Sequence, residues 1–310
     1  YLIKEMLEGN AVTRKTQVHL DRCLTCRACE TTCPSGVQYG RLVDIGRAVA
    51  EQHVQRPWRE RVMRKLLRAV IPHPQRFTPL LRLGQLIRPL LPATVQHSVP
   101  SRQSASTWPA LRHARRMLVL EGCVQPSIAP NINAAAARVL DRLGISLLRA
   151  DKAGCCGAVS YHLNAHDEGM DFMRRNIDAW WPHIQVGVEA IVMTASGCGT
   201  LVKDYGHILR HDPVYAEKAA RVSALCRDLS EILAVEDLST LALAKQKQKI
   251  AFHAPCSLQH AQQLPGVVEK ILTAAGFELT PVPDAHLCCG SAGTYAILQK
   301  GLSQQLLHNK

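Results

Sequence analysis

The sequence lacks several common features, and each absence argues against a class of protein. No apolar run reaches the length of about 18 residues that marks a transmembrane helix, and no signal peptide is visible. No G-x-G-x-x-G follows a strand and no G-x-x-x-x-G-K-[ST] occurs, so the sequence gives no sign of a flavin, nicotinamide or nucleotide site. Aromatic residues make up only 5% of the 310 residues, whereas 47% are hydrophobic. The core should therefore consist mainly of Leu, Val, Ala and Ile.

Cysteine is abundant by contrast, and the twelve cysteines are clustered. Four lie in the run CLTCRACETTCP, and four more form vicinal pairs at 155–156 and 288–289. Neighbouring cysteines rarely bridge each other, and nothing in the sequence indicates export. Clustered cysteines in a cytoplasmic chain usually bind metal or carry out redox chemistry. We therefore expect a cytoplasmic protein with metal-binding cysteines.

The first cysteine run has the spacing of a ligand loop for an iron–sulfur cluster. Soft thiolates match the iron of a sulfide cage, and C-x2-C-x2-C lets one loop present Cys23, Cys26 and Cys29 to one cluster. Cys33 is followed by a proline, and in two-cluster ferredoxins the cysteine at this place ligates the other cluster. We predict a 4Fe-4S cluster here. The alternatives are a disulfide knot or a zinc site, although zinc loops more often pair C-x2-C with a distant second pair.

A two-cluster ferredoxin needs two such cysteine runs, and this chain has only the one at Cys23–Cys33. We expect the partner run to precede Tyr1, which is not a Met, and to bring the number of 4Fe-4S clusters to two. That run would supply the fourth ligand to the cluster of Cys23, Cys26 and Cys29. Cys33 would in turn ligate the cluster that the partner run builds.

Residues 56–116 carry the positive charge of the molecule. They hold thirteen Lys and Arg residues and one acid, whereas the rest of the chain is neutral. The segment WRERVMRKLLRAVI predicts a helix with an apolar face. Such a helix can rest on an anionic bilayer, where each nearby cation adds about 1 kcal/mol. The apolar face holds Trp58, Val62, Leu66, Ala69 and Val70, and Arg59, Arg64 and Arg68 lie largely opposite.

Membrane contact is one of two evenly weighted interpretations of this basic segment, the other being a solvated linker or a docking face for a partner subunit. Membrane contact would make the protein peripheral on the inner face of the cytoplasmic membrane. Nucleic-acid binding is disfavoured, because aromatics are few and leucines separate the cations. We expect prolines to break the segment into short pieces, which suits surface binding better than spanning. They lie at positions 72, 74, 79, 89 and 92.

The sequence divides into three parts. Residues 1–55 predict a small ferredoxin-like helical domain, with helices at YLIKEMLEG and GRLVDIGRAVAEQ, and 56–116 form the basic segment. In 117–310 short apolar strands alternate with helices, which is typical of an α/β layer fold. That part forms two units, 117–248 and 249–310. We expect strands at 117–120, 145–148, 190–194, 250–253 and 277–282, helices at INAAAARVLDRL and PGVVEKILTAAG, and an exposed turn at 245–249.

The two units are repeats of one another. Each begins with a strand that runs into a Cys-containing loop and later reaches Cys-Cys-Gly. Cys155 follows Cys123 by 32 positions, and Cys288 follows Cys256 by the same 32. The first unit continues to Cys198, whereas the equivalent position of the second lies beyond Lys310. We therefore expect the chain to be truncated at this end as well.

The cysteines of both units should fall just after strands, at the edge where an α/β sheet gathers ligands. Two interpretations stay open: these residues ligate a further cluster, or they are small buried residues of a repeated fold. Cys226 matches neither unit and is predicted to be a core thiol. The candidate ligands are Cys123, Cys155, Cys156 and Cys198 in the first unit and Cys256, Cys288 and Cys289 in the half-built second. The nearby histidines His162, His166, His253 and His286 are more often structural than ligating.

Together these motifs resemble a known family. CLTCRACETTCPSGVQYGRLVD followed by two Cys-Cys-Gly units is similar to the iron–sulfur subunit of bacterial glycolate oxidase (glycolate dehydrogenase), over essentially the whole chain. Cys-Cys-Gly units also occur in heterodisulfide reductases, anaerobic glycerol-3-phosphate dehydrogenases and lactate-utilisation proteins. In the heterodisulfide reductase relatives these units hold non-cubane clusters. Family members of the glycolate type carry a first cysteine run and a last cysteine that this chain lacks.

The resemblance implies an electron-transfer role in an oxidoreductase complex. Separate FAD-containing subunits would oxidise glycolate to glyoxylate, and this chain would pass the electrons one at a time toward a membrane quinone. The alternative is the equivalent subunit of a heterodisulfide reductase-like, glycerol-3-phosphate or lactate dehydrogenase complex. Two further functions are a disulfide-cleaving active site at the Cys-Cys-Gly units and a zinc-stapled scaffold. A chain without its own flavin is not expected to oxidise the substrate alone.

Overall fold

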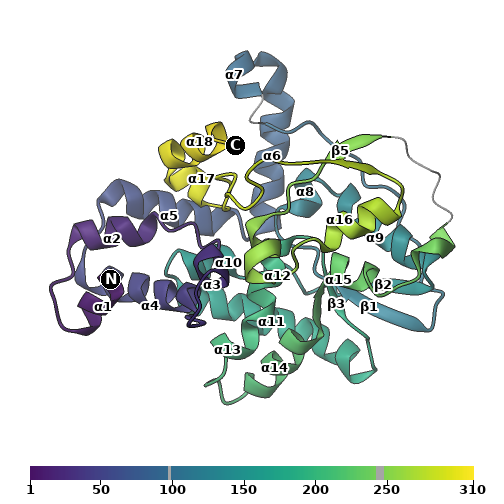
Figure 1. Cartoon of the computed structure of the whole chain (residues 1–310), viewed down its shortest axis with the longest axis horizontal. Coiled ribbons are helices and arrows are strands. Elements are labelled where there is room, and N and C mark those ends of the chain that lie inside the picture. The colour runs from purple at the N-terminus through teal and green to yellow at the C-terminus, as the bar shows by residue number, and fades with distance from the viewer. Residues whose placement is uncertain (97–98, 242–247) are drawn as a thin grey trace.

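The protein, seen here in a computed structural model, is described at residues 1–96, 99–241 and 248–310. Its fold is α/β, as the sequence predicts, with a helical N-terminal part followed by two parallel sheets (Figure 1). A strand lies at each of the five predicted places, and a further strand, β4 (Cys226–Asp228), has no counterpart in the sequence prediction. No described helix is long and apolar enough to cross a bilayer.

The N-terminal part is built around a small apolar core. Ile3, Leu20 and Val43 are buried there, between the first, second and fourth helices. The second helix begins at a capping box, in which the side chains of Thr13 and Thr16 each accept a backbone N–H of the other residue. The helices are α1 (Leu2–Leu7), α2 (Arg14–Asp21), α3 (Ala28–Thr31) and α4 (Tyr39–His53), so both predicted helices of this part are present.

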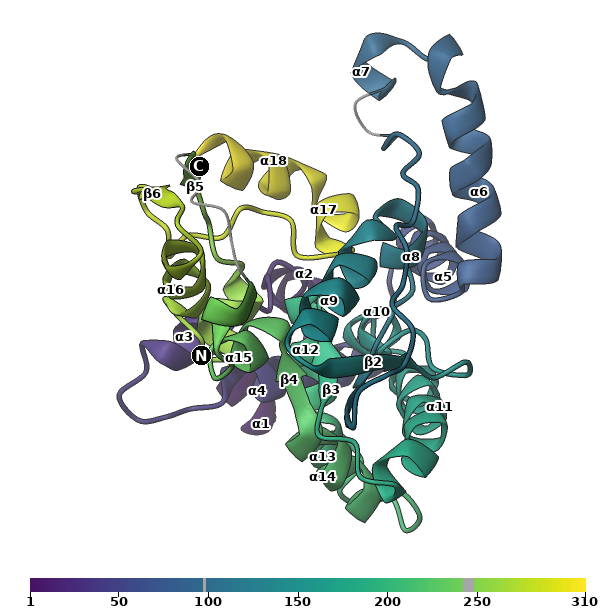
Figure 2. The ribbon, with the colours of Figure 1, turned by 90° about the vertical axis from the view of Figure 1, so that its right-hand side faces the viewer.

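Two longer helices carry the basic segment. α5 (Trp58–Val70) contacts the body, and α6 (Pro74–Ile87) projects from it toward the turn η1 (Arg88–Leu90) and α7 (Ala93–Gln96) (Figure 2). The expectation that the prolines break this segment into short pieces is wrong for Pro79, which lies inside α6. The helix packs against α8 (Gln125–Ile128), where the hydroxyls of Thr78 and Ser127 lie 2.6 Å apart. This contact supports α6 beside a residue that lacks an N–H donor.

The first unit contains a four-stranded parallel sheet whose order is β2-β1-β3-β4. Both faces of the strands are buried, and Leu118, Ile145 and Ile191 are fully enclosed. Such continuous apolar strands are typical of parallel sheets covered on both sides. The strands other than β4 are β1 (Arg115–Val119), β2 (Ile145–Arg149) and β3 (Ile191–Met193).

Helices cover both faces of this sheet. On one face the alanines of α9 (Asn131–Arg142) pack closely against the strands, and on the other Trp180 and Tyr205 form the centre of the larger core. This core consists of buried apolar side chains, whose removal from water stabilises the first unit. The remaining elements are α10 (Ala158–His162), α11 (His166–Gln185), α12 (Ser196–Lys203), α13 (Tyr205–Ile208), α14 (Ala216–Leu225), α15 (Leu229–Leu233) and η2 (Leu238–Leu241).

The second unit is smaller. Its two parallel strands are β5 (Lys249–Ala251) and β6 (Glu278–Thr280), and their side chains are half-buried or exposed. Of the turn predicted at 245–249, residues 245–247 lie outside the described residues, and Lys249 begins β5. The helical elements are η3 (Ser257–Ala261), a π-helical turn, α16 (Val267–Ala274), α17 (Tyr295–Leu298) and α18 (Lys300–His308).

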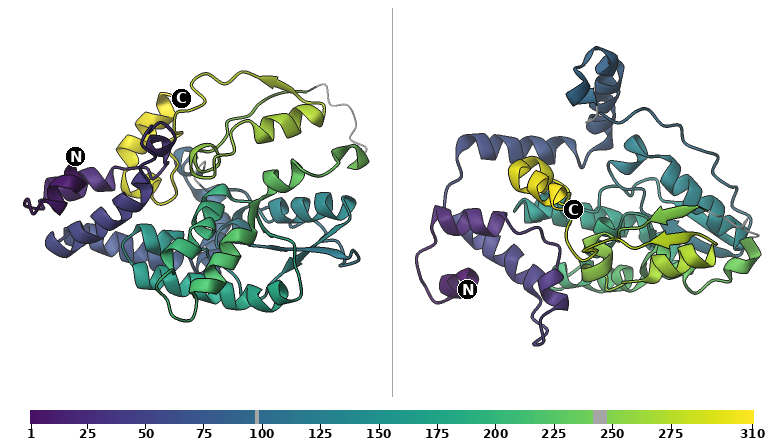
Figure 3. Two further views of the ribbon diagram at one scale, coloured as in Figure 1. Left: turned by 60° about the horizontal axis from the view of Figure 1, so that its bottom comes forward. Right: turned by 45° about the horizontal axis from the view of Figure 1, so that its top comes forward.

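The C-terminal helices return to the N-terminal part. Figure 3 shows α17 and α18, in yellow, beside the purple N-terminal helices. The Tyr295 hydroxyl donates to the carbonyl of Arg22 at 3.3 Å, immediately before the cysteine run. The second unit therefore contacts the ferredoxin-like part next to its ligand loop.

Candidate cluster-binding site

The strand order of the first unit explains how its cysteines meet. β1 and β3 are neighbours, and β2 lies on the far side of β1, so successive connections leave the sheet in opposite directions. A crevice forms at such a switch point, outside the carboxyl ends of the strands. Cys123 follows β1, the pair Cys155-Cys156 follows β2, and Cys198 lies in the first turn of α12 after β3. All four therefore reach the same edge of the sheet.

The four thiols form a continuous series of contacts. Cys123 contacts Cys155, Cys155 contacts Cys156, and Cys156 contacts Cys198. The contact with Cys155, together with burial, raises the pKa of the Cys123 thiol. The contact with Cys123 lowers the pKa of Cys155, but Cys156 and burial outweigh it and bring the pKa to about 12. Uncharged, these thiols are inert; a soft metal would displace their protons.

Buried hydrogen bonds fix the backbone of the Cys155-Cys156 pair. Asn176 donates to the carbonyl of Cys155 at 2.8 Å, and the Tyr205 hydroxyl donates to that of Cys156 at 2.7 Å. The Asn176 side chain also accepts the N–H of Gly154 at 2.9 Å. Asn176 and Tyr205 are fully buried, so these bonds are shielded from water.

The second unit repeats the arrangement in part. Cys256 follows β5 and Cys288-Cys289 follow β6, and the thiols of Cys256 and Cys288 contact each other. Because Cys256 donates to Cys288, the pKa of Cys256 is raised and that of Cys288 is lowered. All three thiols are partly exposed, whereas Cys155 and Cys156 are buried.

The glycine of each Cys-Cys-Gly motif has the same structural role. Gly157 and Gly290 have φ of +95° and +78°, and the N–H of each donates to the first thiol of its pair at 3.4 Å. A Cβ at Gly157 would lie 2.6 Å from the carbonyl oxygen of Gly169, and one at Gly290 would lie 2.3 Å from that of Ser303. Only glycine fits, because a helix backbone packs directly against the turn.

The ferredoxin-like loop places three of its cysteines within electrostatic reach of one another. Burial raises the pKa of Cys29, and the neighbouring Cys23 and Cys26 add to that rise. The loop includes two non-glycine residues in the left-handed region, Thr25 and Arg27, with φ of 54° and 59°. Such backbone is unfavourable in ordinary loops and recurs where a chain wraps around a ligand.

Cys33 is not one of the cysteines that influence the pKa of Cys29. Backbone N–H groups, chiefly those of Val37 and Ser35, donate to its sulfur and lower its pKa. The expectation that Cys33 ligates a different cluster stays a prediction.

Nine of the twelve cysteines line a single cavity of about 540 Å³. Cys29, Cys33 and Cys226 are the cysteines outside this lining. Cys226 is fully buried in β4, as predicted for a core thiol. The nine that line the cavity are Cys23, Cys26, Cys123, Cys155, Cys156, Cys198, Cys256, Cys288 and Cys289.

The donor set of the cavity fits iron–sulfur clusters. It consists mainly of soft thiols, which are the ligands that such clusters prefer. Within the described ranges, no three His, Cys, Asp or Glu side chains could hold a single metal ion. A zinc site needs its ligands around one centre, with Zn–S of about 2.3 Å, whereas a cluster spreads its thiolates over several iron atoms.

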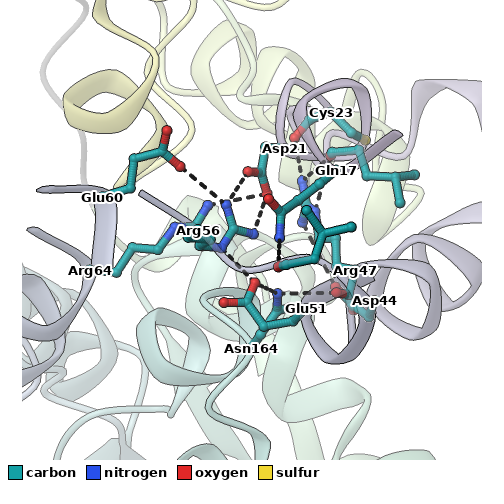
Figure 4. Close-up of polar contacts among 12 residues, drawn as sticks. Gln17, Asp21, Cys23, Asp44, Arg47, Glu51, Arg56, Glu60, Arg64 and Asn164 are labelled. Carbon is teal, nitrogen blue, oxygen red and sulfur yellow. Dashed lines mark hydrogen bonds and ion pairs between the residues drawn. The ribbon is translucent and has the colours of Figure 1, made fainter. Parts of the chain in front are cut away.

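Buried arginines lie beside the cysteine loop, a feature that sequence reasoning missed. Arg47 donates to the carbonyls of Leu20 and Cys23 (Figure 4). Both Arg47 and Arg64 line the cavity. Asp21 pairs with Arg56, which is almost fully buried, and also with Arg64 at 3.1 Å. The available signal was an arginine within the otherwise apolar face of the helix GRLVDIGRAVAEQ.

The four candidate histidines have different surroundings. His162 and His253 line the cysteine cavity, and His253 also contacts the carbonyl of Ala285 at 3.1 Å. His166 stacks on Tyr161 with ring centroids 4.5 Å apart, and His286 is exposed.

Comparison with known proteins agrees with this architecture. Residues 117–203 and 250–310 match the family model described as a cysteine-rich domain. The chain is 59% identical over 311 residues to the glycolate oxidase iron–sulfur subunit of Escherichia coli, covering 100% of this chain and 76% of that protein. It is 28% identical to the probable glycolate oxidase iron–sulfur subunit of Bacillus subtilis, covering 94% and 71%. Lactate utilization protein A of Bacillus licheniformis is 29% identical over 61% of this chain and 77% of its own length.

Proposed function

The chain belongs to the family of glycolate oxidase iron–sulfur subunits, and from this premise we propose that it is the electron-transfer subunit of a glycolate dehydrogenase. FAD-containing partner subunits oxidise glycolate to glyoxylate, and this chain passes their electrons to a membrane quinone. The observation that carries the proposal is the convergence of nine cysteines, from three separate segments, on one cavity.

The ligand assignment follows the grouping of the thiols. Cys23, Cys26 and Cys29 hold one 4Fe-4S cluster, and Cys33 serves a second. The set that follows the strands of the first unit holds a further cluster. When bound, such clusters supply one-electron transfer, because their iron changes oxidation state in single steps. The first-unit set is Cys123, Cys155, Cys156 and Cys198.

The chain's own residues control the environment of this site. Arg47 and Arg64 lie at the cavity wall together with Asp21, which pairs with Arg64, and the net positive charge of these three groups favours a more negatively charged, reduced occupant. The N–H groups of Gly157 and Gly290 donate to cysteine sulfur, which stabilises thiolates. Burial of the Cys155-Cys156 pair keeps water away from the ligand bonds.

The exposed side of the α5–α6 segment fits the surface of an anionic bilayer. Trp58, Leu66 and Leu86 are 63%, 53% and 77% exposed, and Arg59 lies over the Trp58 ring at 5.5 Å. The opposite side of α5 packs inward through Leu67 and through Arg64, which is paired with Asp21. Apolar side chains flanked by cations are the pattern of an interfacial helix. We accordingly place the protein in the cytoplasm, peripheral on the inner face of the membrane.

Vesicle flotation tests this membrane contact. The protein should float with vesicles that contain anionic lipid and stay in solution with purely zwitterionic ones. Leu66→Glu should abolish flotation, whereas Val235→Glu, at an exposed site that follows α15 in the first unit, should not. Flotation that is the same for L66E and the parent protein would contradict the contact.

The electron-transfer role is tested on the anaerobically purified complex. Iron, acid-labile sulfide and electron paramagnetic resonance should reveal clusters on this chain. Glycolate-dependent dye reduction should fall at least tenfold when the chain is omitted and recover when it is added back. A chain free of sulfide, or a complex equally active without it, would end the proposal.

Lactate is the second candidate substrate for the partner subunits, because a lactate utilization protein is among the relatives. Replacing glycolate by lactate or glycerol 3-phosphate in the same dye assay separates these alternatives. A faster rate with either would reassign the substrate and leave the electron-transfer role in place.

A further inference from the structure

A second cavity, of about 270 Å³, lies between α4 of the ferredoxin-like part and the helices α10, α12 and α13 of the first unit. Its wall combines aliphatic side chains, among them Ile45 and Ile208, with titratable groups. The volume is just below the range of about 300–1,000 Å³ that holds drug-sized ligands. It fits a single substituted ring.

This second cavity adjoins the cysteine cavity. His162 lines both of them. A series of polar contacts also joins them: Arg47 donates to the carbonyl of Cys23 at 2.7 Å and lies 3.9 Å from Asp44, whose carboxylate is 3.3 Å from Nδ1 of His162. A ligand here would be separated from the thiol cavity by one side chain, which suits electron transfer between the two.

The polar groups of the wall are those that a proton-coupled reduction needs. With Nδ1 of His162 held by Asp44, Nε2 is the ring nitrogen left for a ligand. The Nε2 atom of His166 is buried and has no hydrogen-bond partner in the described part of the chain. The stacked rings of Tyr161 and His166 provide a flat surface beside it. His162 donates from Nε2 in its protonated form, and His166 donates from Nε2 in the tautomer that carries its proton there. Two such donors and a flat wall match a planar ring with two carbonyl oxygens.

We propose that this cavity binds the ring of a quinone and that His162, positioned by Asp44, donates a proton to one of its oxygens. The inference rests on the proposed function, which supplies the electrons. The ring takes up two electrons, one at a time, and two protons. Each C=O becomes C–OH as an O–H bond forms at each oxygen. One proton comes from His162, which is reprotonated from solvent, and the other comes from solvent directly.

The wall favours a quinone over a small carboxylate. Asp44 and Asp204 both line the cavity, and Arg27 already pairs with Asp204. Arg41 and Arg210 also line the cavity and leave its wall net cationic, so the preference for a ring rests on the aliphatic side chains, which a small carboxylate would leave unused. The volume admits the ring and leaves the isoprenoid tail outside, past Ile45, whose side chain is 55% exposed.

Photoaffinity labelling locates the site on the intact complex with its flavoprotein partners. An azido-quinone should label peptides within residues 39–53, 158–166 or 201–210, and excess unlabelled quinone should prevent it. Labelling confined to other segments, or protection by glycolate or glyoxylate instead of quinone, would overturn the proposal. This experiment needs no turnover, so the labelling can fail while the proposed electron-transfer role still stands.

Kinetics of variants give the second test. His162→Gln should lower kcat for a short-chain quinone about 100-fold, with little change in KM, because a general acid acts in the reaction and not in binding. Ile45→Trp, which narrows the entrance, should instead raise KM for quinone at least tenfold. His211→Gln, an exposed histidine outside the cavity lining, is the matched control and should change neither constant.

Four readouts separate the possible failures. Iron and sulfide content and the paramagnetic signals of His162→Gln should equal those of the parent protein, which excludes damage to the clusters. Asp44→Asn should lower kcat for quinone less than His162→Gln does, as expected of a positioning residue. An unchanged ratio of quinone to dye reduction in both His162→Gln and Ile45→Trp would overturn the site. Glycolate-dependent dye reduction that does not need this chain would instead overturn the proposed function.

Discussion

The two Cys-Cys-Gly units share a motif but differ in what supports it. In the first, the vicinal cysteines lie at the edge of a four-stranded sheet with a core on each face, and their carbonyls are held by Asn176 and Tyr205. In the second, two half-exposed strands carry a partly exposed pair. The turn itself is the same in both, down to the N–H···S contact of its glycine. The local motif is therefore encoded locally, whereas its rigidity depends on the surrounding fold.

The units also differ in how the ferredoxin-like part contacts them. Charged groups connect it to the first unit, through the pairs Asp44–His162 and Arg27–Asp204. Contacts with the second unit are uncharged and exposed or half-buried, as between Thr31 and His260 at 3.0 Å. Variants that remove matched groups from the two units test whether this asymmetry matters.

The largest expected difference is in metal content. Cys155→Ser should remove one cluster's share of iron and sulfide, whereas Cys288→Ser should remove little, because four thiols meet in the first unit and three in the second. Cys226→Ser, at a buried thiol outside the cavity, is the control and should keep all its iron. Equal losses for the first two variants would mean that both units hold iron, and no loss from either would make these thiols structural.

The next difference is in stability. Gly157→Ala forces a positive φ and a clash with backbone in a well-packed unit, and should lower the free energy of unfolding by about 3–5 kcal/mol. Gly290→Ala should cost about 1–3 kcal/mol, because the exposed helix α18 can move aside.

Denaturant titration of both glycine variants gives these values. Gly187→Ala is the control, since Gly187 has φ of +92° with nothing within 4 Å of its added Cβ. If Gly157→Ala lowers the free energy of unfolding no more than Gly187→Ala does, the clash with Gly169 is relieved in the variant.

A smaller effect concerns the charged contact with the first unit and its pH dependence. Burial raises the pKa of Asp44, but His162 and Arg47 outweigh it and hold the pKa below its usual value. The pair should therefore stabilise the fold fully above the unfolded pKa of about 3.9 and lose this effect as pH falls through the lower folded value. Asp44→Asn should cost about 1–2 kcal/mol at neutral pH, and the difference from the parent protein should shrink below about pH 4. Denaturation curves at several pH values measure the difference in free energy of unfolding between Asp44→Asn and the parent protein. A difference that grows as pH falls would contradict a stabilising role for the Asp44 carboxylate.

The smallest effect is expected at the second unit. Tyr295→Phe removes one hydrogen bond of 3.3 Å to the carbonyl of Arg22 and should cost about 0.5–1 kcal/mol. Hydrogen exchange should show faster opening of α17 and α18 with the first unit unaffected. Equal acceleration in both units would mean that they unfold together.

The sequence predicts the secondary structure well where apolar periodicity is strong. The five expected strands and the helices α1, α4, α5, α9 and α16 are present because each has one clear period. β4 escaped prediction, since Cys226–Asp228 is three residues long and mixes a buried thiol with two charged groups. The continuous helix through Pro79 was also not predicted, because packing of α6 against α8 overrides the tendency of proline to break a helix.

The residues of the candidate site were likewise predicted only in part. Cysteine spacing named every thiol that lines the large cavity as a candidate ligand, and in the two units the spacing of the repeat encodes the edge of the sheet. Whether these thiols bind a cluster stays a prediction. Arg47, Arg64 and Asp44 were not identified, because their role depends on how α4 and α5 contact the first unit, and spacing along the chain says nothing of contacts between distant segments. Cys29 and Cys33 belong to the motif but lie outside the cavity lining.

The two buried side chains that hold the Cys155 and Cys156 carbonyls have a consequence for maturation. For the cluster proposed at this site, their hydrogen bonds would fix the positions of these cysteines before iron binds, so that a preassembled cluster could be transferred to a folded chain. Oxidative loss of that cluster would leave the binding site folded, and a new cluster could be inserted into the same polypeptide.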